Sequence, residues 1–365
     1  MQQKAASCDT YIVMFYKIIS ISTRSPNLAE QVEALIEQQK DIRCVLPGEI
    51  LAKKIKIEGK PFIPVFSEPR TWRKMPAEQL KYLGITLPKE PSLYECIMPG
   101  SDSKYVHIIN ENTYQSLSTI EKSYTRKSWL LNEDQKVLKV FLSGHTGNKQ
   151  LFHIGANYMP CGKDHSMIWM PPEINNGKNV GLRQVYHGLD LLYWVDDLLR
   201  LFNNTEHRLF YNSLGTGNSS DILHFQGMKE KFPAFAQFTY SYPNLNTSRV
   251  IFTRREDWPF RGFLARYIPE TKQSILKELH RYIKAWLRRD PRNTFNLLAQ
   301  SRLNGRGIMH EIFVVKRKFD LYCVEGMTNE FSGAEVGGRI LLPNREEYEN
   351  FQDIEHFQWD YSRLN

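Results

Sequence analysis

The sequence predicts an α+β fold with a largely antiparallel sheet and packed helices, and three observations lead to this prediction. Short apolar runs bounded by Gly, Pro, Asn and Ser predict strands. Two longer segments carry apolar residues at helical spacing. The order in which strands and helix follow one another occurs twice along the chain. A duplicated architecture, with helices packed on the sheet, follows from this repetition.

The first unit is expected over residues 131–230. It begins with three strands, at 136–144, 150–158 and 165–172. A helix is expected next, because a set of apolar residues lies along one face at helical spacing. That set is Leu189, Leu192, Val195, Leu199 and Phe202, within the segment 186–202. Two further strands are then expected, at 207–213 and 221–228.

The second unit is expected over residues 231–365 and repeats this order more loosely. Its strands are expected at 249–255, 262–268, 294–300 and 310–318. Its long amphipathic helix is expected over 269–289. Residues 1–130 contain Pro-rich segments and are interpreted as an N-terminal α+β region of short strands and turns, whose role the sequence does not indicate.

Composition and charge indicate the class of protein and the kind of partner. The chain has 365 residues, 41% hydrophobic and 24% charged, as is typical of a soluble globular protein. Its formal net charge of +8 favours an anionic partner: nucleic acid, a membrane surface or a phosphorylated small molecule. No recognised nucleic-acid-binding motif accompanies this charge. The apolar run 11–21 is interrupted by Lys17 and is too short to span a bilayer, so we interpret it as a core strand.

The cysteines and histidines indicate neither a disulfide framework nor a metal. The five cysteines are far apart, and no pair has zinc-ligand or redox spacing. A reducing, cytoplasmic location is the simpler expectation. The spacings of His145, His153 and His165 fit no recognised ligand set, so we expect no metal and no cofactor.

The stretch "YNSLGTGNSSDILHFQG", from Tyr211 to Gly227, is the clearest candidate for chemistry. In a strand, His224 and Gln226 share one face, while Leu223 and Phe225 point to the other. A loop with glycines, exposed N–H groups and hydroxyls precedes them and suits anionic oxygens such as phosphate. Imidazole is a good nucleophile toward phosphorus. The alternative is a structural histidine on a partly buried strand after an ordinary turn.

This stretch resembles the active-site strand of the histidine-triad superfamily, in its nucleotidyltransferase and phosphorylase branch. The family pattern is His-x-His-x-Gln or His-x-His-x-His after a small-residue loop, and the segment is similar to the GDP-L-galactose and GDP-D-glucose phosphorylases. Further segments of roughly 135–355 resemble that family in the same order. The matching positions are Asn157, Pro160, His165, Pro171, Pro259, Gly262, Phe263, Asn296, Arg317, Lys318, Glu335 and Gly338.

The resemblance implies duplicated histidine-triad-like units, as in galactose-1-phosphate uridylyltransferase, and a GDP-hexose phosphorylase that works through a nucleotidyl-histidine at His224. The partners would be a nucleoside-diphosphate sugar or a dinucleotide, together with inorganic phosphate. Gln226 would hold the phosphoryl oxygens without acting as an acid or base. The candidate nucleotide and phosphate contacts are Asn157, His165, Asn212, Gly217, Asn218, Ser219, Arg317 and Lys318. The competing interpretation for His165 is a structural role at a strand end. For Arg317 and Lys318 it is a position at a solvated strand end.

Ile222 departs from the family pattern, which has its first histidine at this position. The backbone carbonyl remains, and in the superfamily that carbonyl holds the Nδ1–H of the nucleophile. Two other functions therefore stay open: a diadenosine polyphosphate phosphorylase or related nucleotidyltransferase, and a non-catalytic nucleotide-binding member. The sequence does not indicate which base is recognised or how many subunits assemble.

Overall fold

The computed structural model describes sixteen parts of the chain. They are residues 28–41, 48–57, 59–71, 137–157, 160–170, 173–175, 178–180, 184, 186–213, 216, 223–243, 247–290, 293–305, 307–318, 332–342 and 344–351. The expected strand at 11–21, and Pro171, Gly217, Asn218, Ser219 and Ile222, lie outside these ranges.

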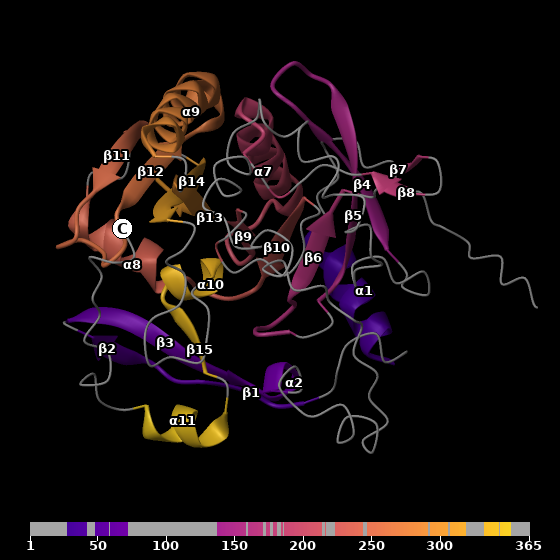
Figure 1. Ribbon diagram of the computed structural model, residues 1–365, viewed down its shortest axis with the longest axis vertical. Coiled ribbons are helices and arrows are strands. Elements are labelled where there is room, and N and C mark those ends of the chain that lie inside the picture. The colour runs from indigo at the N-terminus through magenta and orange to yellow at the C-terminus, as the bar shows by residue number, and fades with distance from the viewer. Residues whose placement is uncertain are drawn as a thin grey trace, which may run out of the picture.

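A nine-stranded antiparallel sheet forms the centre of the protein (Figure 1). Its spatial order is β11-β12-β14-β13-β9-β10-β6-β5-β4. In chain order the strands are β4 (Leu138–Ser143), β5 (Lys149–Ala156), β6 (Ser166–Trp169), β9 (Arg208–Asn212), β10 (His224–Met228), β11 (Arg249–Thr253), β12 (Gly262–Tyr267), β13 (Asn293–Asn304) and β14 (Gly307–Lys318). The predicted α+β fold with an antiparallel sheet is confirmed.

The topology is that of a duplicated unit. One unit runs β5-β6-helix-β9-β10 and the other β11-β12-helix-β13-β14. In space the two halves meet at β9 and β13, and each half continues outward in the matching order. Since β9 and β13 pair directly, both units belong to one continuous sheet.

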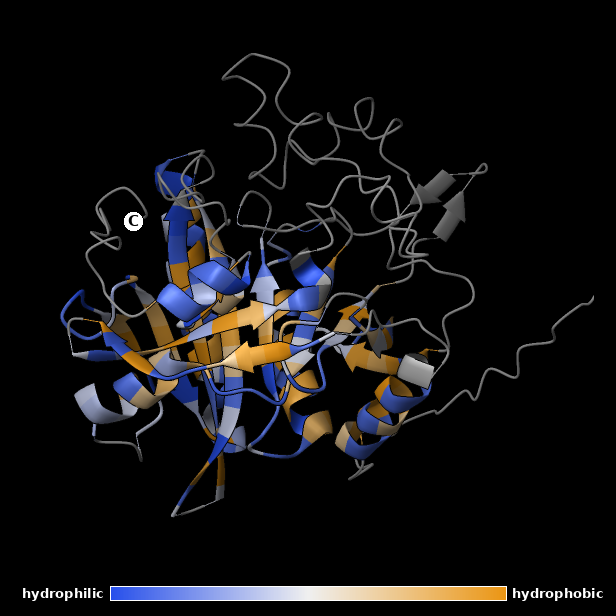
Figure 2. Cartoon of the chain, turned by 90° about the horizontal axis from the view of Figure 1, so that it is seen from below, coloured by the Kyte–Doolittle hydropathy of each residue, from blue (hydrophilic) through white to orange (hydrophobic). Residues whose placement is uncertain are grey.

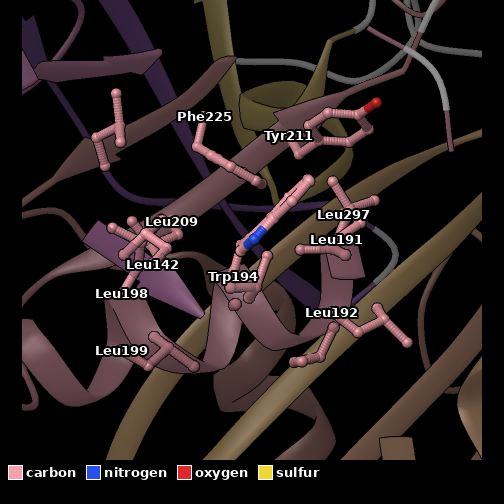
Figure 3. Packing of buried hydrophobic residues seen from close by; sticks show 14 of the residues in the cluster. Leu142, Leu191, Leu192, Trp194, Leu198, Leu199, Leu209, Tyr211, Phe225 and Leu297 are labelled. Carbon is pink, nitrogen blue, oxygen red and sulfur yellow. The ribbon is translucent and has the colours of Figure 1, made fainter. Parts of the chain in front are cut away.

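Helix α7 (Leu189–Phe202) packs on one face of this sheet, beside α9 (Lys272–Arg289) and α1 (Leu28–Asp41). The helix begins three residues later than the segment expected from its apolar spacing. Gly188 precedes it with φ 64°, a left-handed conformation that favours glycine. Its apolar residues pack in one core with the sheet residues Leu209, Tyr211 and Phe225 (Figure 3).

Helix α9 is amphipathic, as its sequence predicts. Its buried residues recur at helical spacing and are Ile275, Leu276, Leu279 and Ile283. The expected helix began at Pro269, but Pro269–Thr271 form a single 3₁₀ turn before α9 starts. Figure 2 shows the hydrophobic colouring concentrated in the strands and the hydrophilic colouring on the outer sides of helices such as α1. No helix among the described ranges has the length and apolar character to cross a membrane.

A smaller sheet covers the other face of the nine-stranded sheet (Figure 1). Its strands are β1 (Ile50–Ala52), β2 (Ile55–Ile57), β3 (Lys60–Ser67) and β15 (Arg339–Leu342). Strand β15 pairs with β3 in parallel, so the N-terminal region is joined to the C-terminal one. The short helices on this side are α2 (Glu68–Thr71), α8 (Pro233–Ser241), α10 (Gly333–Val336) and α11 (Arg345–Asn350), and a separate hairpin pairs β7 (Glu173–Asn175) with β8 (Lys178–Val180).

Candidate active site

Strand β10 has two different faces, as its sequence predicts. Leu223 and Phe225 are fully buried in the core under α7. His224 and Gln226 alternate with them and therefore lie on the opposite face. His224 is 1% exposed and Gln226 is half-buried. The histidine and glutamine thus lie on the same face as Phe210, which packs in one core with the small sheet.

The backbone of His224 is held from both sides. On one side it pairs with Trp169 of β6. On the other side the Gln184 side chain bonds to it twice: the His224 N–H donates to Gln184 Oε1 at 2.7 Å, and Gln184 Nε2 donates to the His224 carbonyl at 2.9 Å. Gln184 Nε2 also donates to the Asn212 carbonyl at 2.8 Å. The buried amide of Gln184 therefore bridges β10 and β9.

This bridge stands where the ladder between β9 and β10 stops. The last residue pair at this end of the ladder joins Gln226 to Phe210. Continuing the register would place His224 opposite Asn212. Gln184 instead inserts its side-chain amide between these two residues and satisfies three of their backbone groups. Because an unmet buried backbone group is costly, the bridge keeps the strands apart without loss of hydrogen bonds.

Gln226 is oriented by His165. The Cys161 N–H donates to His165 Nδ1 at 3.0 Å, so the ring proton must be on Nε2. His165 Nε2 then donates to Gln226 Oε1 at 2.9 Å. Burial, with the positive charges of Arg70 and Arg339, lowers the pKa of His165 to about 3, so the ring stays neutral. Its proton therefore remains in place to hold the Gln226 carbonyl.

Asn157 adds to this orientation. Its Nδ2 donates to Gln226 Oε1 at 3.4 Å and contacts Met167 Sδ at 3.2 Å. Asn157 Nδ2 also lies 3.1 Å from His165 Nε2. Because Nε2 carries the ring proton, both atoms are donors and this contact is not a hydrogen bond. With its carbonyl oxygen facing these two side chains, Gln226 presents its NH₂ group away from them. Asn157 and His165 are thus brought together as supports of Gln226.

A second polar group lies on the same face, across β9, β13 and β14. Asn296 Nδ2 donates to Asn212 Oδ1 and to Thr216 Oγ1, both at 2.9 Å. Arg317 Nη1 donates to Asn296 Oδ1 at 2.7 Å, and the Gly333 N–H donates to Asn212 Oδ1 at 2.7 Å. These hydrogen bonds fix the start of α10 over the end of β9.

The remaining sequence candidates lie in different places. Glu335 is buried and caps α10, where its Oε2 accepts from the Ser332 N–H at 2.9 Å. Burial raises the pKa of Glu335. Lys318 ends β14, and its side chain is outside the described part of the chain. Among the residues that the structure does describe, no three His, Cys, Asp or Glu side chains are grouped to hold a metal ion.

Sequence reasoning missed Gln184 and Trp169. Gln184 stands alone between the first strands and α7, with no periodic pattern around it. Trp169 was expected only as an apolar strand residue, yet it pairs with His224 and lies on the same face of the sheet. Its buried indole N–H has no acceptor in the described ranges. The nearby His153, whose pKa is lowered to about 4 by burial and by Lys139, contacts the Trp169 ring edge-on.

Two solved structures of yeast Ap4A phosphorylase Apa2 resemble this fold. The complex with Ap4A has a TM-score of 0.54 and 15% identity, over 91% of this chain and 95% of that one. The complex with AMP has a TM-score of 0.52 and 16% identity, over 89% and 91%. The two proteins share a fold. No protein-family model and no curated protein sequence matches the chain.

The shared fold agrees with the histidine-triad-like architecture that the sequence motifs imply. The likeness extends over nearly the whole length of both chains. At this level of identity the likeness concerns the fold alone.

Proposed function

We propose that this protein is a nucleotidyltransferase that splits a nucleoside polyphosphate and passes the nucleotidyl group to inorganic phosphate, with His224 as nucleophile. The observation that carries the proposal is the pairing of two side chains on one strand face. The His224 backbone is fixed by Gln184, and the Gln226 amide is oriented by His165. A nucleophile and a hydrogen-bond donor for phosphoryl oxygens are the parts that this chemistry requires.

In the first step an imidazole nitrogen of His224 attacks the α-phosphorus. A P–N bond forms, and the P–O bond to the leaving phosphate breaks, with the electron pair going to the leaving oxygen. A phosphate is a weak base, so its departure needs little help from a general acid. The NH₂ group of Gln226 donates to the equatorial oxygens, where negative charge collects.

In the second step an oxygen of inorganic phosphate attacks the phosphorus of nucleotidyl-His224. A P–O bond forms, the P–N bond breaks and its electron pair returns to the imidazole, releasing a nucleoside diphosphate. Water is a poorer nucleophile and must lose a proton as it attacks. Gln226 cannot take that proton because an amide does not titrate, so transfer to phosphate is favoured over hydrolysis.

For the substrate we favour a diadenosine polyphosphate. The solved structures that share the fold are of an Ap4A phosphorylase, one with Ap4A and one with AMP, and this supports the choice. The second candidate is a GDP-hexose, supported by the resemblance of "NSLGTGNSSDILHFQG" to the GDP-hexose phosphorylases. A third candidate, binding of a nucleotide without turnover, is favoured by Ile222 at the position of the first motif histidine.

A panel of Ap4A, other dinucleoside polyphosphates and GDP-hexoses separates these candidates. Each compound is incubated with the protein alone, and the intact mass is measured for a nucleotidyl adduct. Phosphate is then added, and the nucleoside diphosphate is quantified. An adduct with Ap4A that phosphate converts to ADP supports the first candidate, and GDP from GDP-hexose supports the second. Tight binding of a nucleotide with no adduct supports the third.

The variant His224→Ala is expected to form no adduct and no product, while its melting temperature stays near that of the wild type. The matched control is His145→Ala, which removes an exposed imidazole in the turn between β4 and β5, where it pairs with Asp190 of α7. This control should keep full activity. Near-normal turnover by His224→Ala would rule out the covalent mechanism.

A further inference from the structure

Arg339 extends from the small sheet to the turn that precedes His165. It is the first residue of β15 and is 1% exposed. Its Nη1 donates to Glu230 Oε2 at 3.0 Å, and Glu230 Oε1 accepts from the Lys163 N–H at 3.2 Å. The guanidinium therefore lies beside the turn 160–165, which also carries the Cys161 N–H that holds His165.

Arg70 approaches the same turn from its other end. The Ser67 hydroxyl donates to the Pro160 carbonyl at 2.6 Å, which fixes the end of β3 against the turn. Helix α2 starts at the next residue and contains Arg70. The positive charges of both arginines act on His165 and Cys161, lowering the pKa of His165 and opposing the rise that burial causes in the pKa of Cys161.

Both guanidinium groups have donors with no acceptor. Within the described ranges, Nε and Nη2 of Arg339 and Nε of Arg70 are buried and make no hydrogen bond. Glu230 satisfies only one nitrogen of Arg339, and Glu335, which also interacts electrostatically with Arg70, uses its Oε2 to bind Ser332. Buried charged donors without partners are costly, and a bound anion would satisfy them.

The position of these donors relative to His224 is informative. Along β10 the order is His224, then Gln226, and His165 lies beside Gln226 on the side away from His224. The turn with the two arginines comes after His165 in that direction. The unpaired guanidinium donors therefore occur beyond Gln226 and His165, on the side away from His224. A substrate whose phosphate chain extends from His224 past Gln226 would bring its leaving phosphates to these donors.

We infer that Arg339 and Arg70 form a phosphate pocket that holds the leaving phosphate groups of the substrate and then the inorganic phosphate that replaces them. The role in turnover rests on the proposed function, whereas the pocket itself requires only the two arginines. Arginine suits the task because its planar group binds a phosphate through two parallel hydrogen bonds.

The test is calorimetric titration of the full chain with inorganic phosphate, without nucleotide. Arg339→Met keeps the aliphatic part of the side chain and is expected to weaken phosphate binding about tenfold or more, since it removes charged hydrogen bonds. The matched control is Arg345→Met on α11, which removes an arginine whose side chain is 57% exposed and pairs with Glu49 and Glu349. It should bind phosphate as the wild type does. Equal affinity of Arg339→Met and wild type, or no binding by the wild type, would overturn the pocket.

Circular dichroism and melting temperature check the fold of each variant. Phosphate should raise the melting temperature of the wild type and of Arg345→Met but not of Arg339→Met. If Arg339→Met fails to fold, Arg70→Met takes its place, with a loss of affinity of about threefold or more expected from one missing charged partner. Unchanged affinity in that folded variant would equally refute the pocket.

The outcome is separable from that of the proposed function. Repeating the titration in His224→Ala measures the pocket without the covalent step, and phosphate binding should be retained. If no nucleotidyl adduct ever forms while phosphate binds through Arg339, the proposed function fails and the pocket stands. If the adduct forms, but phosphate removes it with the same concentration dependence in Arg339→Met, the pocket fails and the proposed function stands.

Discussion

At the scale of single residues, the site depends on amides that do not titrate. Gln184 holds the backbone of His224, the proposed nucleophile, and the carbonyl oxygen of Gln226 accepts from His165. An amide offers both a donor and an acceptor in one planar group, so Gln184 can bond to the N–H and the carbonyl of the same residue. The main chain of the proposed nucleophile is therefore held by a side chain 40 residues away in the sequence.

Gln184→Leu should destabilise the protein and slow nucleotidyl transfer. The change keeps the volume but leaves the His224 N–H and two carbonyls without this partner, at a cost of about 2–4 kcal/mol in the free energy of unfolding. Denaturant unfolding and the rate of adduct formation measure the two effects. The control is Gln300→Leu, which removes a buried amide bonded to Glu311 and should lose stability without losing activity. Normal adduct formation by folded Gln184→Leu would contradict the positioning role.

Gln226→His should raise hydrolysis relative to phosphorolysis. An imidazole can assist the proton transfer that attack by water requires, whereas an amide cannot. The measurement is the ratio of nucleoside monophosphate to nucleoside diphosphate formed at a fixed phosphate concentration. Gln237→His on α8 serves as control, because Gln237 is half-buried and its side chain donates to Ser241 Oγ on the same helix. An unchanged product ratio in Gln226→His would remove Gln226 from this role.

At the scale of elements, helix α7 supports the strands that carry the site. Trp194 projects from α7 toward the sheet, where Phe225 and Tyr211 lie beside it (Figure 3). Its ring also contacts Phe152 of β5 edge-on, with centroids 5.5 Å apart. Phe225 alternates with His224 and Gln226 on β10, so the packing of its ring against α7 helps to set which face these two residues occupy.

Trp194→Ala is therefore expected to cost about 3–5 kcal/mol in the free energy of unfolding, because it leaves a large cavity under β5 and β10. Tyr193→Ala is the control on the same helix. Tyr193 is half-buried and lies under the Lys272 ammonium, so its loss should cost about 1 kcal/mol. Chemical denaturation of both variants gives the comparison. Similar losses for the two would contradict the supporting role of Trp194.

At the scale of the whole molecule, buried neutral histidines make stability depend on pH. Burial lowers the pKa of His165 to about 3 and that of His207 to about 4. In the unfolded chain both titrate near 6.5. Below that pH the unfolded state binds protons that the folded state does not accept. The stabilisation is therefore complete above about pH 6.5 and is lost as the pH falls toward about 4.

Between pH 7 and pH 5 the free energy of unfolding should fall by about 2 kcal/mol for each of these histidines. Urea unfolding at a series of pH values measures the slope. His207→Gln tests the assignment, because His207 stacks on Phe202 just before β9 begins, at the end of that strand opposite to Asn212. Between pH 7 and pH 5 the free energy of unfolding of His207→Gln should fall by about 2 kcal/mol less than that of the wild type. An equal decrease would show that His207 does not contribute.

The sequence by itself determined the strands of the large sheet, helices α7 and α9, and the two-faced character of β10. These features repeat every two or every three to four residues, so neighbours in the sequence are enough to specify them. The alternation of Leu223, His224, Phe225 and Gln226 predicted that His224 and Gln226 share one face of the strand while the two apolar residues face the core under α7. The sequence also predicted a duplicated unit, because the order of strands and helix repeats along the chain. Helices α7 and α9 both begin about one turn later than the sequence predicted, because the backbone at Gly188 and the 3₁₀ turn at Pro269–Thr271 precede them.

Only the tertiary structure decided what surrounds His224 and Gln226. Gln184 is 40 residues from His224, and the Gly333 N–H that binds Asn212 is 121 residues away from it. Arg339 reaches the turn at His165 from β15, and Arg70 reaches it from α2, which follows β3; the pairing of β3 with β15 brings these distant segments together. Contacts of this kind arise from the pairing of distant strands, and no local pattern encodes that pairing. The burial of the two arginines' donors likewise depends on the tertiary structure, because burial is a property of the assembled layers.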